Sequence, residues 1–260
     1  MPDREDRLLI YAPVPLFNHG GTLFVEDQAL IGLRHWTRNF GHVDAMLPVE
    51  NAQPPRGWSP ATALDDIPNL ALHKLPTAYR PDQFFRALPQ TRARIRTLID
   101  RNTYLSFAIG GLFGDWGAVG ALTASGMGRD FAVWTDRVES EVTRQAMHAG
   151  PWKARLRARL YHRPMALLER AVVRRATVGL FHGRETYDHY SPYARQSVVM
   201  HNILVDRADH IDAATLAEKR AKVARGPLKL VYAGRADAMK GPLDWVDILA
   251  GLSALGPRGN

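Results

Sequence analysis

The chain has 260 residues, 46% of them hydrophobic, which suffices for a sizeable core in one large domain, or in one domain and part of another. It contains no cysteine, which excludes a disulfide framework and a thiolate zinc site. Its 34 Lys and Arg against 26 Asp and Glu give a net charge of +8, and no apolar run approaches the ~20 residues of a membrane-spanning helix.

Apolar runs and helical periodicities alternate along the sequence. We expect strands near 8–14, 43–49, 70–75, 105–112, 131–136, 177–182, 197–201 and 228–233. We expect helices near 25–38, 82–102, 115–127, 152–175, 185–190, 212–224 and 242–255. Such strand-then-helix repetition predicts a doubly wound, mostly parallel α/β sheet of the Rossmann type. Residues 51–69 are rich in Pro and Asp and predict a surface loop.

The first strand is followed by Asn18-His19-Gly20-Gly21-Thr22 and then by a helical pattern. A strand, a glycine loop and a helix N-terminus together form a typical cradle for an anion or a sugar. Gly20 and Gly21 are therefore candidates for binding an anion or a sugar, and His19 is a candidate base or hydrogen-bond donor. The simpler readings are a turn for the glycine pair and no chemical role for the histidine. No G-x-G-x-x-G dinucleotide fingerprint is present.

Polar residues follow two later strands, and strand ends of this kind face the ligand crevice of an open α/β sheet. The resulting candidates for contact with a ligand are Asp136, Arg137, Glu139, His182 and Arg184. The alternative for Asp136 is a salt bridge with Arg137 or a neighbour. The glycine-rich segment 110–117 predicts either close approach of a ligand or a tight turn.

The composition becomes polar and charged near residues 202–227. We therefore expect an N-terminal Rossmann-like domain at 1–205, a hinge at 206–227, and the first strand–helix unit of a second domain at 228–260. A unit of this size buries little apolar surface, since chains below about 40 residues rarely fold unaided. The second domain is thus expected to be truncated.

The expected strand near 228–233 leads into Gly234-Arg235 and then Lys240-Gly241-Pro242. Gly234 permits a tight turn and close backbone approach. Arg235 offers a planar fork of donors that suits phosphate, and Lys240 offers a mobile point charge. Pro242 fits the first turn of the following helix. On spacing alone, a loop with two solvated cations remains the favoured alternative.

The whole string from Val231 to Pro242 resembles the G-R-x(3–5)-K-G segment of family 4 glycosyltransferases, the retaining GT-B enzymes. The resemblance implies that Arg235 and Lys240, with Gly234, hold the donor diphosphate as it leaves. It also implies that Gly20 and Gly21 form the glycine loop of the acceptor domain and help to bind the donor. The acceptor-side candidates are then His19, Arg137, Glu139, His182 and Arg184, and Asp136 could contact the acceptor or shield positive charge on the reacting sugar. The resemblance covers that domain and the first unit of the donor domain, whereas the family's E-x7-E motif has no counterpart after Lys240.

The resemblance further implies retaining transfer of a sugar from a nucleotide-sugar donor to a glycan or lipid-linked acceptor. The leaving diphosphate would help to deprotonate the acceptor, and the protein would supply positioning and charge stabilisation. No metal or other cofactor is expected. With the donor half incomplete, we expect no transfer by these residues alone. The alternative is a non-catalytic remnant that binds a glycan or a partner.

Cations gather in two expected helices. They are Lys153, Arg155, Arg157, Arg159, His162 and Arg163 in one, and Arg86, Arg92, Arg94, Arg96 and Arg101 in the other. Basic amphipathic helices can lie on anionic membranes. Because many family 4 enzymes act on lipid-linked acceptors, the resemblance is compatible with a cytoplasmic protein that is peripheral on the inner face of a membrane. The favoured alternative is a solvated helix face with its apolar residues in the core. Nucleic-acid binding is not expected, since no RNP-type or helix-turn-helix pattern occurs.

Overall fold

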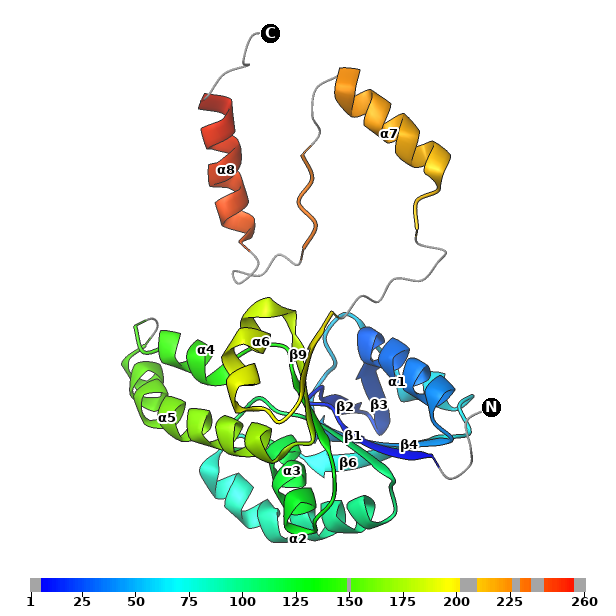
Figure 1. Cartoon of the computed structure of the whole chain (residues 1–260), viewed down its shortest axis with the longest axis vertical. Coiled ribbons are helices and arrows are strands. Elements are labelled where there is room, and N and C mark those ends of the chain that lie inside the picture. Colours follow the sequence, from blue (N-terminus) through cyan, green and yellow to red (C-terminus); the bar gives the residue numbers. More distant parts are fainter. Residues whose placement is uncertain (1–5, 149–150, 202–209, 226–229, 235–240, 255–260) are drawn as a thin grey trace. The chain divides into compact units, whose positions relative to one another are not determined.

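The computed structural model describes residues 6–148, 151–201, 210–225, 230–234 and 241–254 (Figure 1). The chain divides into two compact units, Met1–Leu204 and Val205–Asn260.

The first unit is built on one large sheet. Its strands, in chain order, are β1 (Arg7–Tyr11), β2 (Leu16–His19), β3 (Thr22–Glu26), β4 (His42–Glu50), β5 (Trp58–Pro60), β6 (Leu70–Pro76), β7 (Tyr104–Ala108), β8 (Ala132–Thr135), β9 (Val178–His182) and β10 (Ser197–Met200). Their order in the sheet is β10-β9-β8-β7-β1-β4-β2-β3-β5, with β6 paired to β4 off this path. Only the β2–β3 and β3–β5 pairs among the described strands are antiparallel. The prediction of a mostly parallel α/β sheet is confirmed.

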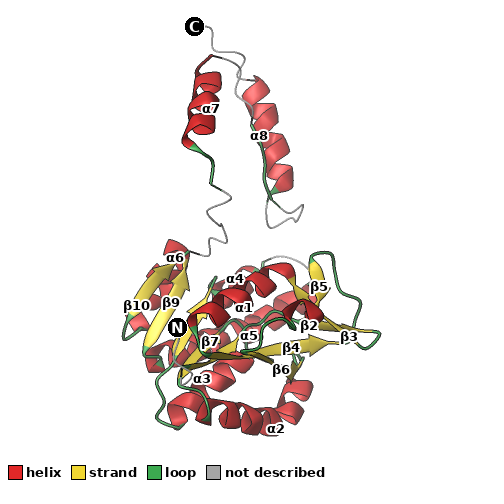
Figure 2. Ribbon diagram, turned by 90° about the vertical axis from the view of Figure 1, so that its right-hand side faces the viewer, coloured by secondary structure: helices red, strands yellow, loops and turns green. Residues whose placement is uncertain are grey.

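Helices cover both faces of this sheet. They are α1 (Asp27–Asn39), α2 (Pro81–Asp100), α3 (Trp116–Gly126), α4 (Glu139–Gln145), α5 (Trp152–Arg175) and α6 (Gly183–Tyr190), with short 3₁₀ turns η1 (Ala61–Leu64) and η2 (Ser191–Tyr193). In Figure 2, α1 lies above the sheet and α2 and α3 lie below it. The sheet is therefore doubly wound, as the alternation of strands and helices predicts.

The central strand β1 shows how the two layers are held. Leu8 and Ile10 pack into the apolar cluster that includes Leu33 of α1. Leu9 and Tyr11 point to the other face and pack into the cluster shared with α2, α3 and α5. Successive residues of a strand face opposite sides, so a strand between two helical layers must be apolar throughout. This explains the continuous apolar run at the start of the sequence.

A buried charge network lies at the amino end of the sheet. Asp44 of β4 is 1% exposed and accepts hydrogen bonds from Arg7 (3.0 Å) and Asn102 (2.9 Å). The Nε2 atom of His73 lies 2.6 Å from Asp44 Oδ1. Burial alone would raise the pKa of Asp44, but the hydrogen bonds from His73 and Asn102 and the charge of Arg101 hold it well below its usual value. The network ties together β1, β4, β6 and the residues that follow α2.

The glycine pair near the N-terminus does not lead into a helix, so that part of the prediction was wrong. Gly20 and Gly21 form the turn of the β2–β3 hairpin, in which His19 pairs with Thr22. Both glycines have positive φ, 58° and 83°, as a two-residue hairpin turn of type I′ requires. Helix α1 begins only at Asp27, after β3. The predicted loop at 51–69 was also wrong in part, because it contains β5 and η1.

The second unit contains α7 (Ala213–Arg225) and α8 (Pro242–Ala254), which confirms the two expected helices. Asp212 caps α7 by accepting the Thr215 amide at 2.8 Å. The expected strand near 228–233 is not found over 230–233, where the backbone has no regular structure. A strand is stabilised by hydrogen bonds to a neighbouring strand, and the described residues of this unit offer none. The division into hinge and donor-side unit stays a prediction.

Candidate functional site

The winding of the sheet reverses between β1 and β7. From β1 the chain moves through the hairpin and α1 to β4 on one side, whereas β7, β8, β9 and β10 follow in order on the other. The connecting helices change face at the same point, from α1 to α2, α3 and α5. Open α/β sheets bind ligands outside the carboxyl ends of the strands at such a reversal. We call the residues that follow β1, β7 and β8 the switch-point edge.

Asp115 is the buried acid of this edge. Its side chain accepts the amide of Gly110 at 3.1 Å and that of Ala118 at 2.9 Å, so it joins the end of β7 to the start of α3. Burial raises the pKa of Asp115 to about 6, although the backbone hydrogen bonds, led by Ala118 and Gly110, act in the opposite direction. Because Asp115 already uses first-turn amides of α3, this helix start is not a free anion site.

Two tyrosines border Asp115. Tyr11 is buried, and desolvation together with the charge of Asp115 raises the pKa of its phenol. Tyr79 is 54% exposed, and partial burial and the charge of Glu50 raise the pKa of its phenol too. Both phenols are therefore neutral hydrogen-bonding groups near neutral pH. Tyr79 is the one of the two that a ligand can reach from solvent.

The predicted residues after β8 are only partly brought together. The Nε atom of Arg137 donates to Glu139 Oε1. The Glu139 side chain packs beside Gly110, so that a Cβ on this glycine would lie 3.3 Å from Glu139 Cγ. Asp136 is exposed. The structure thus places Glu139 and Arg137 at the switch-point edge, and the strand-end ion pair involves Glu139 rather than Asp136.

A buried network that the sequence analysis missed holds Glu139 in place. Glu169 of α5 accepts the Ser140 amide at 3.0 Å and the Ser140 hydroxyl at 2.6 Å. Burial raises the pKa of Glu169, and the Ser140 and Tyr190 hydrogen bonds oppose that shift. Glu169 is the only acid in α5. That single acid among many cations was the signal available in the sequence.

The predicted residues His182 and Arg184 lie at the end of β9, the strand next to β8, where Phe181 pairs with Thr135. The imidazole ring of His182 lies 6.4 Å from that of His201. Arg184 turns along its own helix and pairs with Asp188 at 2.9 Å, with both side chains exposed. A role of His182 or Arg184 in acceptor binding stays a prediction. The ion pair of Arg184 lies within its own helix and does not indicate a binding site.

The hairpin turn is also separate from the switch-point edge. Gly21 lines a wide cavity of about 840 Å³, together with η1 and β6 residues. In the sheet order, β7, β1 and β4 lie between β8 and the hairpin. His19 and Gly20 are exposed. The structure therefore does not bring the glycine pair to Arg137 and Glu139, and its predicted role in donor binding remains untested.

An apolar cavity of about 250 Å³ opens at the carboxyl ends of the central strands, on the face covered by α1. Among its lining residues are Ala12, Gly32, Trp36, Ser106, Trp134 and Met200. Two indole rings and several aliphatic groups suit the apolar part of a ligand or the face of a sugar ring. No pattern in the sequence could reveal this cavity, because its walls come from strands and a helix that only the topology brings together.

The remaining predicted residues belong to the second unit. Gly234 lies in a bend, next to the Tyr232 side chain. Arg235 and Lys240 lie outside the described residues. Across the described ranges no group of three His, Cys, Asp or Glu side chains could hold a metal ion.

No protein-family model matches the sequence, and no curated protein does. Solved structures do match, with low identity. A UDP-glucose:anthocyanidin 3-O-glucosyltransferase bound to UDP has 10% identity and a TM-score of 0.44 over 85% of this chain and 58% of that chain. A UDP-glucosyltransferase from Polygonum tinctorium has 10% identity and a TM-score of 0.39 over 95% and 57%.

A provisionally assigned ribokinase II from E. coli matches to a similar degree, with 9% identity and a TM-score of 0.44 over 76% of this chain and 73% of that chain. The chain spans little more than half the length of the glucosyltransferases that it matches. All three TM-scores lie below 0.5, so any functional assignment must rest on the residues of this chain.

Proposed function

We propose that this chain carries the acceptor side and the first donor contacts of a nucleotide-sugar glycosyltransferase of the GT-B type. The observation that carries the proposal is the sequence Gly234-Arg235, followed by Lys240-Gly241-Pro242 and a helix. A guanidinium and an ammonium next to a helix start are suited to a diphosphate. The apolar cavity beside the sheet reversal supports an acceptor that combines a hydroxyl group with an apolar portion.

In the proposed reaction, the acceptor hydroxyl oxygen bonds to the anomeric carbon of the donor sugar as the bond from that carbon to the diphosphate breaks. The hydroxyl proton passes to the leaving diphosphate, on the same face as in other retaining transfers. Arg235 and Lys240 would stabilise the charge on the diphosphate. Glu139 and Arg137, fixed at the switch-point edge, would orient acceptor hydroxyls, and Asp136 would shield positive charge on the sugar.

The proposal is tested by titrating the full chain with UDP-, GDP- and ADP-sugars, with binding followed calorimetrically. We expect one nucleotide class to bind, and Arg235→Ala or Lys240→Ala to weaken that binding about tenfold or more, as loss of a charge-assisted hydrogen bond does. Arg220→Ala on α7, an exposed cation outside the motif, is the matched control and should bind normally. Absence of binding by every nucleotide sugar, or full binding by both variants, would overturn the proposal.

The second candidate is a binding module that holds a glycan or a partner without transferring sugar. Residues 230–233 favour it, because they do not form the expected strand beneath the proposed diphosphate contacts. Calorimetric titration with nucleotide sugars and with glycans separates the two candidates, because these residues alone are not expected to transfer sugar. Binding of a nucleotide sugar favours the transferase, whereas glycan binding without binding of any nucleotide sugar favours the module.

A further inference from the structure

Helix α5 carries an apolar line on its outward face. Its buried residues are Ala158, Met165, Glu169, Val172 and Val173. On the opposite side, Trp152, Leu156, Leu160 and Leu167 are 68%, 49%, 61% and 66% exposed. Their spacing of four, four and seven residues aligns them along one side of the helix. Scattered exposed leucines are ordinary, but four large apolar side chains in line on the solvent side form a patch.

Cations flank this line, and α5 itself carries no exposed acid. The exposed cations of its N-terminal half are Lys153, Arg155, Arg157, Arg159 and Arg163. Glu169, the only acid of α5, is turned inward to Ser140. Within the described residues, no cation of α5 takes part in a salt bridge. The apolar line and its cations are called the α5 face below.

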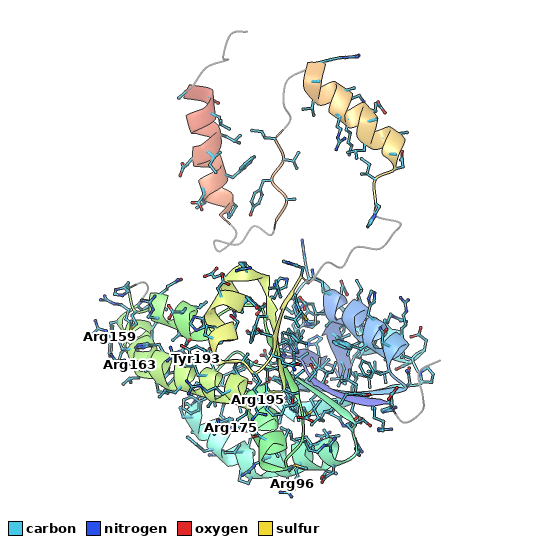
Figure 3. All side chains as sticks on the ribbon, viewed as in Figure 1. Arg96, Arg159, Arg163, Arg175, Tyr193 and Arg195 are labelled. Carbon is cyan, nitrogen blue, oxygen red and sulfur yellow. The ribbon has the colours of Figure 1, made fainter. Side chains whose placement is uncertain are left out.

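Further cations lie on α5 and on other elements of the first unit. Figure 3 labels Arg159, Arg163 and Arg175 of α5, Arg195 after η2, and Arg96 of α2. Near the C-terminal end, the guanidinium carbons of Arg170 and Arg174 lie 5.0 and 5.4 Å from the Tyr193 ring centroid. These stacked arginines are held close to the surface rather than extended into solvent.

We infer that the α5 face docks on an anionic lipid surface, with the helix parallel to the membrane plane. The leucines and Trp152 would enter the headgroup and acyl boundary, and the flanking cations would lie at the level of the lipid phosphates. A hollow of about 240 Å³ lies on this face and is lined by Trp152, Arg155, Leu156 and Arg159. Its two cationic side chains suit a lipid phosphate, and its two apolar side chains suit the acyl chain below that phosphate. No helix among the described residues is long and apolar enough to cross a membrane.

The charge of the α5 face and its side-chain types favour an anionic membrane over a second copy of the chain or a single-stranded nucleic acid. A second copy of the chain would place the same positive face against itself across a two-fold axis, where like charges repel. Single-stranded nucleic acid is bound by aromatic stacking and phosphate contacts, in which exposed leucines have no part. An anionic membrane is the partner that uses both the leucines and the arginines.

Co-sedimentation of the full chain with vesicles tests this inference. Phosphatidylcholine vesicles with 30% phosphatidylglycerol should bind the protein at least about tenfold more strongly than pure phosphatidylcholine, and the difference should shrink in 0.5 M salt. Leu156→Ser with Leu160→Ser should reduce binding about tenfold or more at either salt concentration. Arg155→Gln, Arg159→Gln and Arg163→Gln together should remove the preference for anionic vesicles.

Matched controls come from the second unit. Leu243→Ser with Leu252→Ser removes exposed apolar groups from α8, and Lys219→Gln, Arg220→Gln and Lys222→Gln remove cations from α7. Both controls should bind vesicles as the unchanged chain does. Because all these residues are exposed, circular dichroism should show unchanged folding.

Three results would overturn the inference. The first is equal binding to neutral and anionic vesicles, or none to either. The second is a dimer in analytical ultracentrifugation that the leucine substitutions dissociate, which would make the α5 face a self-association surface. The third is binding of single-stranded DNA that the arginine substitutions abolish and the leucine substitutions leave intact.

Discussion

Gly117 lies so close to Ala108 that a Cβ on the glycine would overlap the alanine carbonyl oxygen. The start of α3 therefore rests directly on the end of β7. We expect Gly117→Ala to lower the free energy of unfolding by about 3 kcal/mol or more, because backbone atoms cannot move aside. Urea titration measures this. Gly126→Ala, at the end of the same helix with nothing within 4 Å, should instead be neutral or stabilise by up to about 1 kcal/mol. Equal effects of the two changes would contradict the close packing.

The raised pKa of Asp115 predicts an unusual pH dependence. Its carboxyl binds a proton more readily in the folded state, so its contribution to stability is complete below pH 4 and is lost as the pH rises to about 6. Asp115→Asn removes this titration. The stability difference between the unchanged protein and this variant should fall by about 3 kcal/mol between pH 4 and pH 7, at 1.36 kcal/mol per pKa unit. Urea titrations at both pH values check it, and a difference that stays constant would argue against a raised pKa.

Asp44 should behave in the opposite way. Its folded pKa lies below the unfolded value, so its contribution is present above pH 4 and is lost as the pH falls below that value. Asp44→Asn leaves Arg7 and His73 without their buried anion and should cost about 3 kcal/mol at pH 7. The cost should shrink towards pH 2. Asp188→Ala, which removes an exposed ion pair, should cost less than about 1 kcal/mol at either pH.

The apolar cavity can be filled from α1. A Cβ on Gly32 would meet nothing within 4 Å, and Gly32 lines the cavity. Gly32→Leu should therefore leave stability unchanged or raise it by about 1 kcal/mol, since leucine is a better helix former. It should also weaken binding of an apolar fluorescent probe about tenfold, read from quenching of tryptophan fluorescence. Gly126→Leu is the control outside the cavity. Unchanged probe binding in Gly32→Leu would show that ligands do not enter there.

Much of the first unit follows from periodicity in the sequence. The apolar run at β1 and the helical patterns of α1, α2, α3 and α5 each place their element within a few residues. The hairpin was missed although His19-Gly20-Gly21-Thr22 is a strong two-residue turn signal, because residues 18–22 were interpreted as a binding loop that leads into a helix from Val25. The strand expected near 230 failed for a different reason: an apolar run predicts a strand only where a neighbouring strand can pair with it.

The candidate site was predictable only in part. Position at a strand end predicts that Arg137 and Glu139 lie at the edge to which parallel strands bring their carboxyl ends, and their role in acceptor binding stays a prediction. Asp115 could have been recognised as a helix N-cap between a glycine-rich strand end and an apolar helix. The contribution of Glu169 and the walls of the apolar cavity depend on packing between segments far apart in the chain, which no local pattern encodes.

The inward turn of Glu169 has a consequence for α5 itself. With that acid committed to Ser140, the outer half of the helix has no countercharge of its own, and its first turn contains no acid. Lys153 and Arg155 instead stand at the positive end of the helix dipole. Repulsion between these cations and the helix dipole therefore destabilises the first turns of α5. Lowering the salt concentration should increase this repulsion. A phosphate-rich surface would supply the missing countercharge, so we expect α5 to be more stable when it is bound to such a surface than when it is free.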